Sequence, residues 1–149
     1  MNRLTAAALI AIAVAIAGFE ARAQETAVAR VKIAEGDTFV MRGPTRESLA
    51  VGEPIYLSDT VETAAGSLGI TFLDGARISV GPNSIVQIKD FQYSPRDGKL
   101  AFLVNLLQGT MLYVSGVIEK LAPQSVHVET PYATVGVRGT RFLARVDPE

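Results

Sequence analysis

The sequence contains no cysteine and a single histidine, His127. The missing thiols exclude a disulfide framework and thiolate metal sites, and zinc sites need several Cys or His ligands. Basic residues are not in excess either, with 14 Lys and Arg against 15 Asp and Glu and a formal net charge of −1. A nucleic-acid binder carries a clustered basic surface, and no such cluster stands out here. We therefore expect no metal, no cofactor and no nucleic-acid partner.

Long apolar runs are also scarce, except at the N-terminus. There one basic residue, Arg3, precedes an unbroken apolar run over residues 6–18, and Ala21 and Ala23 supply small residues at the positions that a signal peptidase reads. A membrane anchor is the alternative, but the run is shorter than the roughly 20 residues that a spanning helix needs. The pattern predicts a signal peptide over residues 1–23, cut after Ala23.

Cleavage leaves residues 24–149 as the mature chain. Removing Arg3, Arg22 and Glu20 turns 14 basic residues into 12 and 15 acidic residues into 14, so the net charge becomes about −2. No other apolar stretch is long enough to cross a bilayer. A chain of this length makes one domain whose core is large enough to fold without disulfides or a structural metal. We expect a periplasmic or secreted protein with no membrane span after cleavage.

Alternation of apolar and polar residues recurs along the mature chain, whereas helical periodicity does not. Each alternating run predicts a strand with one buried face. The runs cover residues 28–33, 67–72, 76–80, 85–88, 99–107 and 125–130. Turn signals separate them, among them the Asp74-Gly75 pair, which predicts a two-residue hairpin turn. Many short strands without a crossover helix predict a single all-β domain.

Two segments that begin thirty residues apart echo one another, since 109–114 and 139–144 both open a strand with Gly-Thr. Two copies do not establish a repeat protein, which normally shows three or more units. The echo nevertheless favours a β-solenoid or β-helix-like stacking of strands over the alternative, a β-sandwich.

Five motifs follow one another along the chain, at Asp59 to Thr63, Asp74 to Val80, Gly81 to Ser84, Gly109 and Thr130 to Phe142. In this order they resemble the FecR domain, the periplasmic module of bacterial iron-citrate signalling regulators and of many secreted proteins of unassigned role. The resemblance covers about Ile55 to Val146, and it departs from the family at Ala76, where Ser or Thr is usual. It implies a set of motif residues whose role is structural. These are Asp59, Thr63, Asp74, Gly75, Gly81, Gly109, Thr130, Pro131, Gly136, Arg138, Gly139, Thr140 and Phe142.

The full signalling regulators of that family resemble an assembly of four parts. A cytoplasmic segment handles a sigma factor, a helix spans the membrane, the FecR domain follows, and a C-terminal module touches an outer-membrane transporter. In this chain a cleavable leader takes the place of the cytoplasmic segment and the helix. We therefore expect a secreted interaction or structural module that does not pass a signal across the membrane by itself.

No residue pattern favours catalysis. The Asp-Gly-Ala tripeptide at 74–76 has the wrong residue order for an aspartic protease motif and lacks a second copy, so a hairpin turn is favoured. His127 alternates with two valines, which is typical of a solvent-facing strand residue, and no G-x-S-x-G elbow occurs. We expect no enzyme.

Near the C-terminus one arginine, Arg138, lies among small residues and glycines. Gly136 and Gly139 suit a close backbone approach or a positive φ. Two roles are open for the guanidinium. It pins a loop by pairing with carbonyls or with a carboxylate from the Asp59 or Asp74 turn, or it binds a partner or ligand. The structural role is favoured, because nothing acidic or aromatic in the motif suggests a cleft.

The leading functional hypothesis is a protein-interaction module in envelope sensing or signalling, whose partner is another envelope protein and whose contact surface is exposed strand edges or loops. The alternatives are a binder of cell-wall glycan or another polysaccharide, and an architectural envelope component. Glycan sites are usually aromatic platforms, for which Tyr93, Tyr113 and Tyr132 are the candidates, whereas Tyr56 is better placed for packing. The sequence leaves the oligomeric state open.

Overall fold

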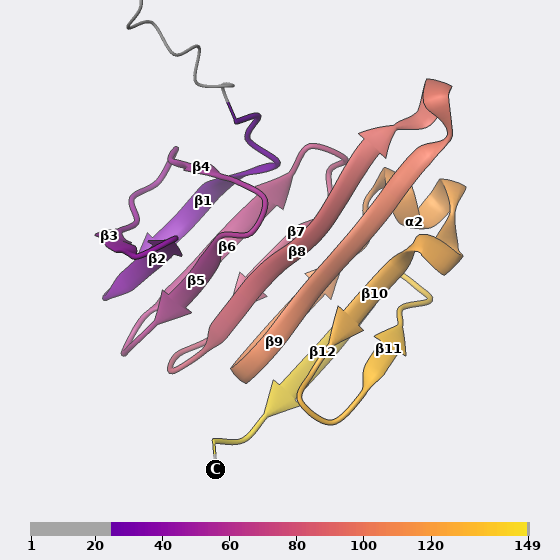
Figure 1. The fold of residues 1–149 in the computed structure, drawn as a ribbon. Helices are drawn as coiled ribbons and strands as arrows, with labels where there is room; N and C mark the ends of the chain where they lie inside the picture. Colours follow the sequence, from indigo (N-terminus) through magenta and orange to yellow (C-terminus); the bar gives the residue numbers. More distant parts are fainter. Residues whose placement is uncertain (1–24, 149) are drawn as a thin grey trace, which may run out of the picture.

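A computed structural model describes residues 25–148 (Figure 1). The predicted signal peptide, with Ala21 and Ala23, lies outside the described residues. Most of the described chain is strand, which confirms the all-β class. The strands are β1 (Ala29–Glu35), β2 (Thr38–Arg42), β3 (Thr45–Ser48), β4 (Pro54–Ile55), β5 (Thr60–Thr63), β6 (Ser67–Phe72), β7 (Arg77–Val80), β8 (Ile85–Ser94), β9 (Lys99–Val114), β10 (Val126–Glu129), β11 (Thr134–Gly136) and β12 (Arg141–Val146). The helical segments are η1 (Pro95–Asp97), α2 (Val117–Leu121) and η2 (Pro123–Ser125).

The strands form one curled sheet whose two halves share the 16-residue strand β9. The C-terminal half of β9 belongs to the first half-sheet, with strand order β4-β1-β6-β7-β9-β12. Its N-terminal half belongs to the second half-sheet, with order β3-β2-β5-β8-β9-β10-β11. On the same side of β9, the first half-sheet therefore ends in β12, and the second half-sheet ends in β11, which pairs with β10.

The chain passes from one half-sheet to the other through a bend made of residues 36–37, 64–66, 81–84 and 109–110. At this bend β1 continues into β2, β5 into β6, and β7 into β8, so neighbouring strands turn together. Two glycines approach so closely here that a Cβ on Gly36 would lie 2.9 Å from the Cα of Gly66. Only residues without side chains allow this backbone packing.

The core lies between the two half-sheets and is closed by aromatic rings. Phe72 of the first half-sheet stacks against Phe91 of the second with ring centroids 5.4 Å apart, and against Phe102 at 4.8 Å. Phe102 also contacts Tyr113, at 5.1 Å. These four rings come from β6, β8 and both halves of β9, so burying them fixes how far the sheet curls.

The expected solenoid-like stacking is not confirmed. A solenoid of β-helix type stacks parallel strands, whereas here only the β9–β10 pair is parallel among the described ladders. The two Gly-Thr segments do not form successive coils, because β12 pairs antiparallel with β9 and places Val146 opposite Gly109. The apolar alternation that predicted strands is the same in either arrangement, so it did not reveal strand direction.

The hairpin at Asp74-Gly75 is present, but its loop has three residues. Thr71 pairs with Arg77, and the N–H of Phe72 donates to the carbonyl of Ala76 over 2.8 Å. The predicted two-residue turn is therefore wrong. A tight turn is followed by Gly75 at φ +83°, which is the usual construction of a three-residue hairpin.

A β-bulge in β1 corrects the predicted inner face of that strand. Val31 pairs with Ile70, but Ile33 pairs with Gly69, so Lys32 is the extra residue in the ladder. One inserted residue sends every following side chain to the other face. Val31 is buried as expected, whereas Ile33 points outward and is 51% exposed.

Among residues 25–148, no helix is both long and apolar enough to span a bilayer.

Candidate functional site

Three of the motif residues, Thr63, Gly81 and Gly109, meet at the bend. The Thr63 hydroxyl donates to the carbonyl of Gly81 over 2.5 Å and accepts the N–H of Ser84 at 3.0 Å. The Ser84 hydroxyl in turn accepts the N–H of Thr110 at 2.9 Å. Gly109 has φ +89°, and a Cβ there would lie 2.5 Å from the Cα of Ser84. These contacts hold the bend together, with Thr63 and Ser84 buried and Gly81 and Gly109 partly buried.

Asp74 fixes α2 to the β6–β7 hairpin. Its carboxylate accepts the N–H of Ala76 at 3.1 Å and that of Ile118 at 3.2 Å, and its carbonyl accepts the N–H of Val117 at 2.9 Å. The first N–H groups of a helix lack partners inside the helix, so Asp74 satisfies two of them. A Cβ on Gly116 would lie 2.5 Å from the Asp74 carboxylate, which explains the glycine at this contact.

Tyr113 lies fully buried beside this carboxylate, and within residues 25–148 its hydroxyl has no hydrogen-bond partner. Burial disfavours the phenolate, and the charge of Asp74 disfavours it further, so the pKa of Tyr113 rises to about 12. The prediction that Tyr113 belongs to a glycan-binding platform is therefore wrong, because its ring is buried in the core.

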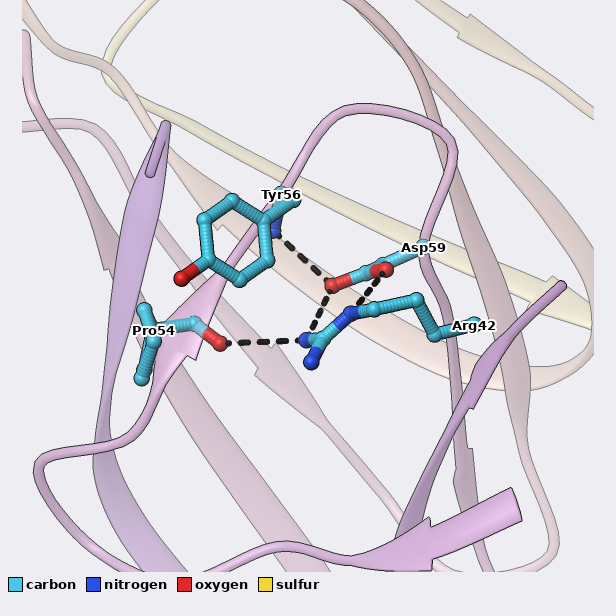
Figure 2. A network of polar contacts seen from close by, with 4 residues as sticks. All are labelled: Arg42, Pro54, Tyr56 and Asp59. Carbon is cyan, nitrogen blue, oxygen red and sulfur yellow. Dashed lines mark hydrogen bonds and ion pairs between the residues drawn. The ribbon is translucent and has the colours of Figure 1, made fainter. Parts of the chain in front are cut away.

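Asp59 is the centre of a third structural network, shown in Figure 2. Its carboxylate is buried, and it accepts two hydrogen bonds from Arg42, Nε at 2.9 Å and Nη2 at 2.8 Å, and a third from the N–H of Tyr56 at 2.9 Å. Arg42 also reaches the carbonyl of Pro54 and lies over the Tyr56 ring at 4.6 Å. The hydrogen bonds to Asp59 raise the pKa of Arg42. The network ties the end of β2 to the segment between β4 and β5.

The sequence did not identify Arg42 as the partner of Asp59, because Arg42-Gly43-Pro44 is typical of a turn. For Arg138 it left several partners open, among them a carboxylate from the Asp59 or Asp74 turn. Neither carboxylate pairs with Arg138, since Asp59 is bonded to Arg42 and Asp74 to backbone N–H groups.

Arg138 itself lies on the surface, and among residues 25–148 its guanidinium has no ion-pair or hydrogen-bond partner. Gly139 adopts φ +108°, as its sequence context suggested, and its N–H donates to the Glu119 carboxylate at 3.2 Å. A Cβ on Gly139 or on Gly136 would meet nothing within 4 Å, so the expected close backbone approach is absent at both.

The rest of the closing motif divides between the surface and the core. The Thr130 hydroxyl accepts the N–H of Ala133 at 3.1 Å and organises an exposed turn that contains Pro131. The carbonyl of Thr140 accepts the N–H of Ser115 at 3.0 Å, which begins the β9–β12 ladder. Phe142 follows in β12 and packs against the core.

The aromatic candidates do not form one platform. Tyr132 is 69% exposed in the Thr130 turn, and Tyr93 is 37% exposed near the β8–β9 hairpin. Tyr93 pairs with Leu100, whereas the Tyr132 turn follows Glu129, which pairs with Asn105. At about 3.3 Å per residue the two rings are separated along β9 by roughly 15 Å or more, too far for one sugar ring.

His127 lies half-buried in β10 between two buried valines, more covered than the expected solvent-facing residue. Within residues 25–148 no three His, Asp or Glu side chains converge as metal ligands would.

The outer face of the first half-sheet carries a groove of about 470 Å³. Its floor follows one row of paired residues across four strands, Ile33, Gly69, Ser79 and Leu112, and the row continues beyond the groove to Leu143 on β12. The small residues in the middle of the row hollow the face. Three exposed cations, Lys32, Arg77 and Arg141, line the groove together with the floor. Within the described chain none of the three has an ion-pair partner.

The groove ends at β12, which among residues 25–148 pairs with β9 alone, so its other edge is open within the described chain. β11 likewise pairs with β10 alone. Leu143 on β12 is 69% exposed, and its neighbours Arg141 and Arg145 on the same face are exposed as well. Open edges with unpaired backbone groups can accept an added strand. An added strand can make directional backbone contacts at this edge, which is longer on β12 than on the terminal strands β3 and β4 at the other ends of the half-sheets.

Comparison with known proteins identifies the family of this chain. A protein-family model described as FecR protein matches residues 59–149. Comparison with curated proteins finds no match. A solved structure described as a cell surface anchoring domain is similar at 31% identity, covering 44% of this chain and 88% of that chain with a TM-score of 0.42, a value too low to support an argument about function. Because the family match takes in more than half of the chain, this protein belongs to the FecR family.

Proposed function

We propose that this protein is a non-catalytic, periplasmic interaction module of envelope sensing or signalling, and that it binds another envelope protein through the open edges of β11 and β12. The observation that carries the proposal is that both half-sheets end, on the same edge of β9, in a strand with one free side. The FecR family match supports an envelope role without chemistry.

The distribution of the motif residues supports the same conclusion. The polar groups of three motif residues are bonded inside the fold. Asp59 binds Arg42, Thr63 bonds within the bend, and Asp74 binds the start of α2. The closing motif, in contrast, leaves Arg138 and the Thr130 turn exposed next to β11 and β12. The buried polar groups already have partners inside the fold, whereas the exposed ones remain available to a binding partner.

Site-specific photo-crosslinking tests this proposal. A photoreactive amino acid replaces Leu143 on β12 in the full chain produced in a Gram-negative host, and a matched control carries it at Val51. Both side chains are exposed, at 69% and 63%, but Val51 lies in the loop between β3 and β4, on the opposite side of the sheet. We expect one discrete covalent adduct with an envelope protein from position 143 and none from position 51. Equal adducts from both positions, or none from either, would contradict the proposal.

A further inference from the structure

We propose that the segment that binds β12 is an extended strand with outward side chains in the order acidic, apolar, acidic, each two residues apart. In this arrangement its carboxylates face Arg141 and Arg145, and its apolar side chain faces Leu143. This inference rests on the proposed function, because it describes the chemistry of the partner at the same edge.

The hydrogen-bond pattern of β12 supplies the first step. The N–H of Ser115 donates to the carbonyl of Thr140, which fixes Thr140 as a hydrogen-bonded position of the β9–β12 ladder. Such positions alternate along an antiparallel pair. Residues 141, 143 and 145 therefore direct their own N–H and C=O groups away from β9, toward the open edge. A strand added there gains backbone hydrogen bonds at these three residues.

The side chains of the same three residues supply the second step. Arg141, Leu143 and Arg145 are all exposed on one face of β12, while the residues between them turn toward the core. Residues directly opposite one another in neighbouring strands have Cβ atoms about 4.5–5.5 Å apart, and opposite charges there are favourable whereas like charges are not. On a partner strand, the side chains opposite Arg141, Leu143 and Arg145 should therefore be acidic, apolar and acidic.

The cations that line the groove beside β12 also favour a negatively charged partner strand. Arg77 on β7 and Arg141 on β12 both pair with Val114, one on each side of it. With strands about 4.8 Å apart, their Cα atoms lie about 10 Å from each other, and both long side chains can reach one anionic group above Val114. Lys32 adds a third cation. Glu35, on the same face of β1, pairs with Ser67 two residues beyond the Ile33–Gly69 pair, and its carboxylate accepts a hydrogen bond from the Ser67 hydroxyl.

Arg145 already has a partner in this chain, since its Nε lies 2.7 Å from the Asp147 carboxylate. Both side chains are 72% exposed, and an exposed pair of this kind contributes little to stability. A carboxylate on the added strand can therefore replace Asp147 at small cost. An anionic lipid surface would also satisfy the cations, but it would make no use of the open backbone groups of β12, so the strand is the better fit.

Synthetic peptides test the inference on the mature protein. The probe is an end-blocked peptide of sequence Thr-Glu-Thr-Ile-Thr-Glu-Thr, the matched control has Lys in place of both Glu residues, and a third peptide carries N-methyl groups on the amides that would face β12. Affinity is measured by calorimetry and the site by amide chemical shifts. We expect the acidic peptide to bind at least about tenfold more tightly than the lysine peptide, to weaken with added salt, and to lose binding on N-methylation.

Charge reversal of the protein sharpens the same test. The Arg141→Glu, Arg145→Glu double variant should prefer the lysine peptide, whereas Arg96→Glu, which reverses an exposed cation in η1 away from β12, should keep the preference for the acidic one. Circular dichroism shows that each variant is folded. Equal binding of the two peptides, binding that survives N-methylation, or binding only to anionic phosphatidylglycerol vesicles would overturn the inference. If position 143 still crosslinks to an envelope protein in that case, the proposed function stands and only the partner's chemistry is wrong.

Discussion

The FecR motif has two regions in this chain that differ in what surrounds them. In the first, from Asp59 to Gly109, the polar groups are buried and bonded to other parts of the fold. In the second, from Thr130 to Thr140, most side chains are exposed, and the glycines have open space around them. The first region builds the curled sheet, and the second presents a surface next to its open edges.

This difference shows that a motif residue is not structural or functional by type. Glycine at 109 is required by the neighbouring Ser84, whereas glycine at 139 is required only by its own backbone angle. Arginine at 42 neutralises a buried carboxylate, whereas arginine at 138 has no such partner among the described residues. The comparison therefore makes paired predictions, in which the same change has unequal effects in the two regions.

The largest difference is expected for the glycines. Gly109→Ala must place a Cβ against Ser84 at a positive φ, which should lower the free energy of unfolding by about 3 kcal/mol or more. Gly139→Ala has the strained angle but open space, so it should cost only about 1 kcal/mol. Urea unfolding followed by circular dichroism measures both. Equal losses would remove the distinction between the two regions.

The arginines give the next largest contrast. Arg42→Ala leaves the buried Asp59 carboxylate without its cation, and breaking a buried pair costs several kcal/mol. Because the Arg42 side chain is 35% exposed, water offsets part of this loss, and we expect about 2 kcal/mol. Arg138→Ala should unfold at the wild-type urea concentration. A clear loss of stability in Arg138→Ala would show that this guanidinium is a clamp after all.

The threonines should differ less. Thr63→Val removes a hydroxyl that both donates to Gly81 and accepts from Ser84 inside the bend, so it should cost about 1.5 kcal/mol. Thr130→Val removes hydrogen bonds in an exposed turn, where water replaces them, and about 0.5 kcal/mol is expected. Thermal melts of the two variants beside wild type decide the order, and the reverse order would contradict the comparison.

The smallest effect at neutral pH is expected for Tyr113→Phe, because the hydroxyl removed has no partner among the described residues. The pKa of Tyr113 is about 12 in the folded state against about 10 in the unfolded chain. The unfolded state therefore releases its proton first, and stability falls as the pH rises from about 10 to 12. Urea midpoints at pH 8 and pH 11 should fall further for wild type than for Tyr113→Phe. Parallel falls would show that Tyr113 does not titrate on unfolding.

Local patterns predicted much of the fold. The alternation in 67–72 and 99–107 placed Leu68, Ile70 and Phe102 inward, and all three are buried. The Asp74-Gly75 signal located a hairpin but not its loop length, because an Asp-Gly pair also suits a three-residue loop in which Gly75 takes the positive φ. The five-residue helix α2 was not foreseen, since so short a helix shows too little periodicity and gains its stability from Asp74 and the core.

The predictions that failed concerned partners. Sequence reasoning did not find the partner of Asp59, because Arg42 lies 17 positions away and is brought there by the β2–β5 pairing. It placed Ile33 inside, because a bulge at Lys32 leaves no trace in the alternation. Contacts between distant segments depend on strand register, which neighbouring residues do not encode.

By itself the sequence determined that this chain is an all-β FecR domain, because alternation, turn residues and the spacing of the motif act over a few neighbouring positions. Only the tertiary structure decided that the strands form one curled, mostly antiparallel sheet, and that within residues 25–148 β11 and β12 have open edges. Strand order and direction follow from which faces bury the most apolar surface together, a property of the whole chain. The surface proposed for binding therefore came from the arrangement of the strands and from no single motif.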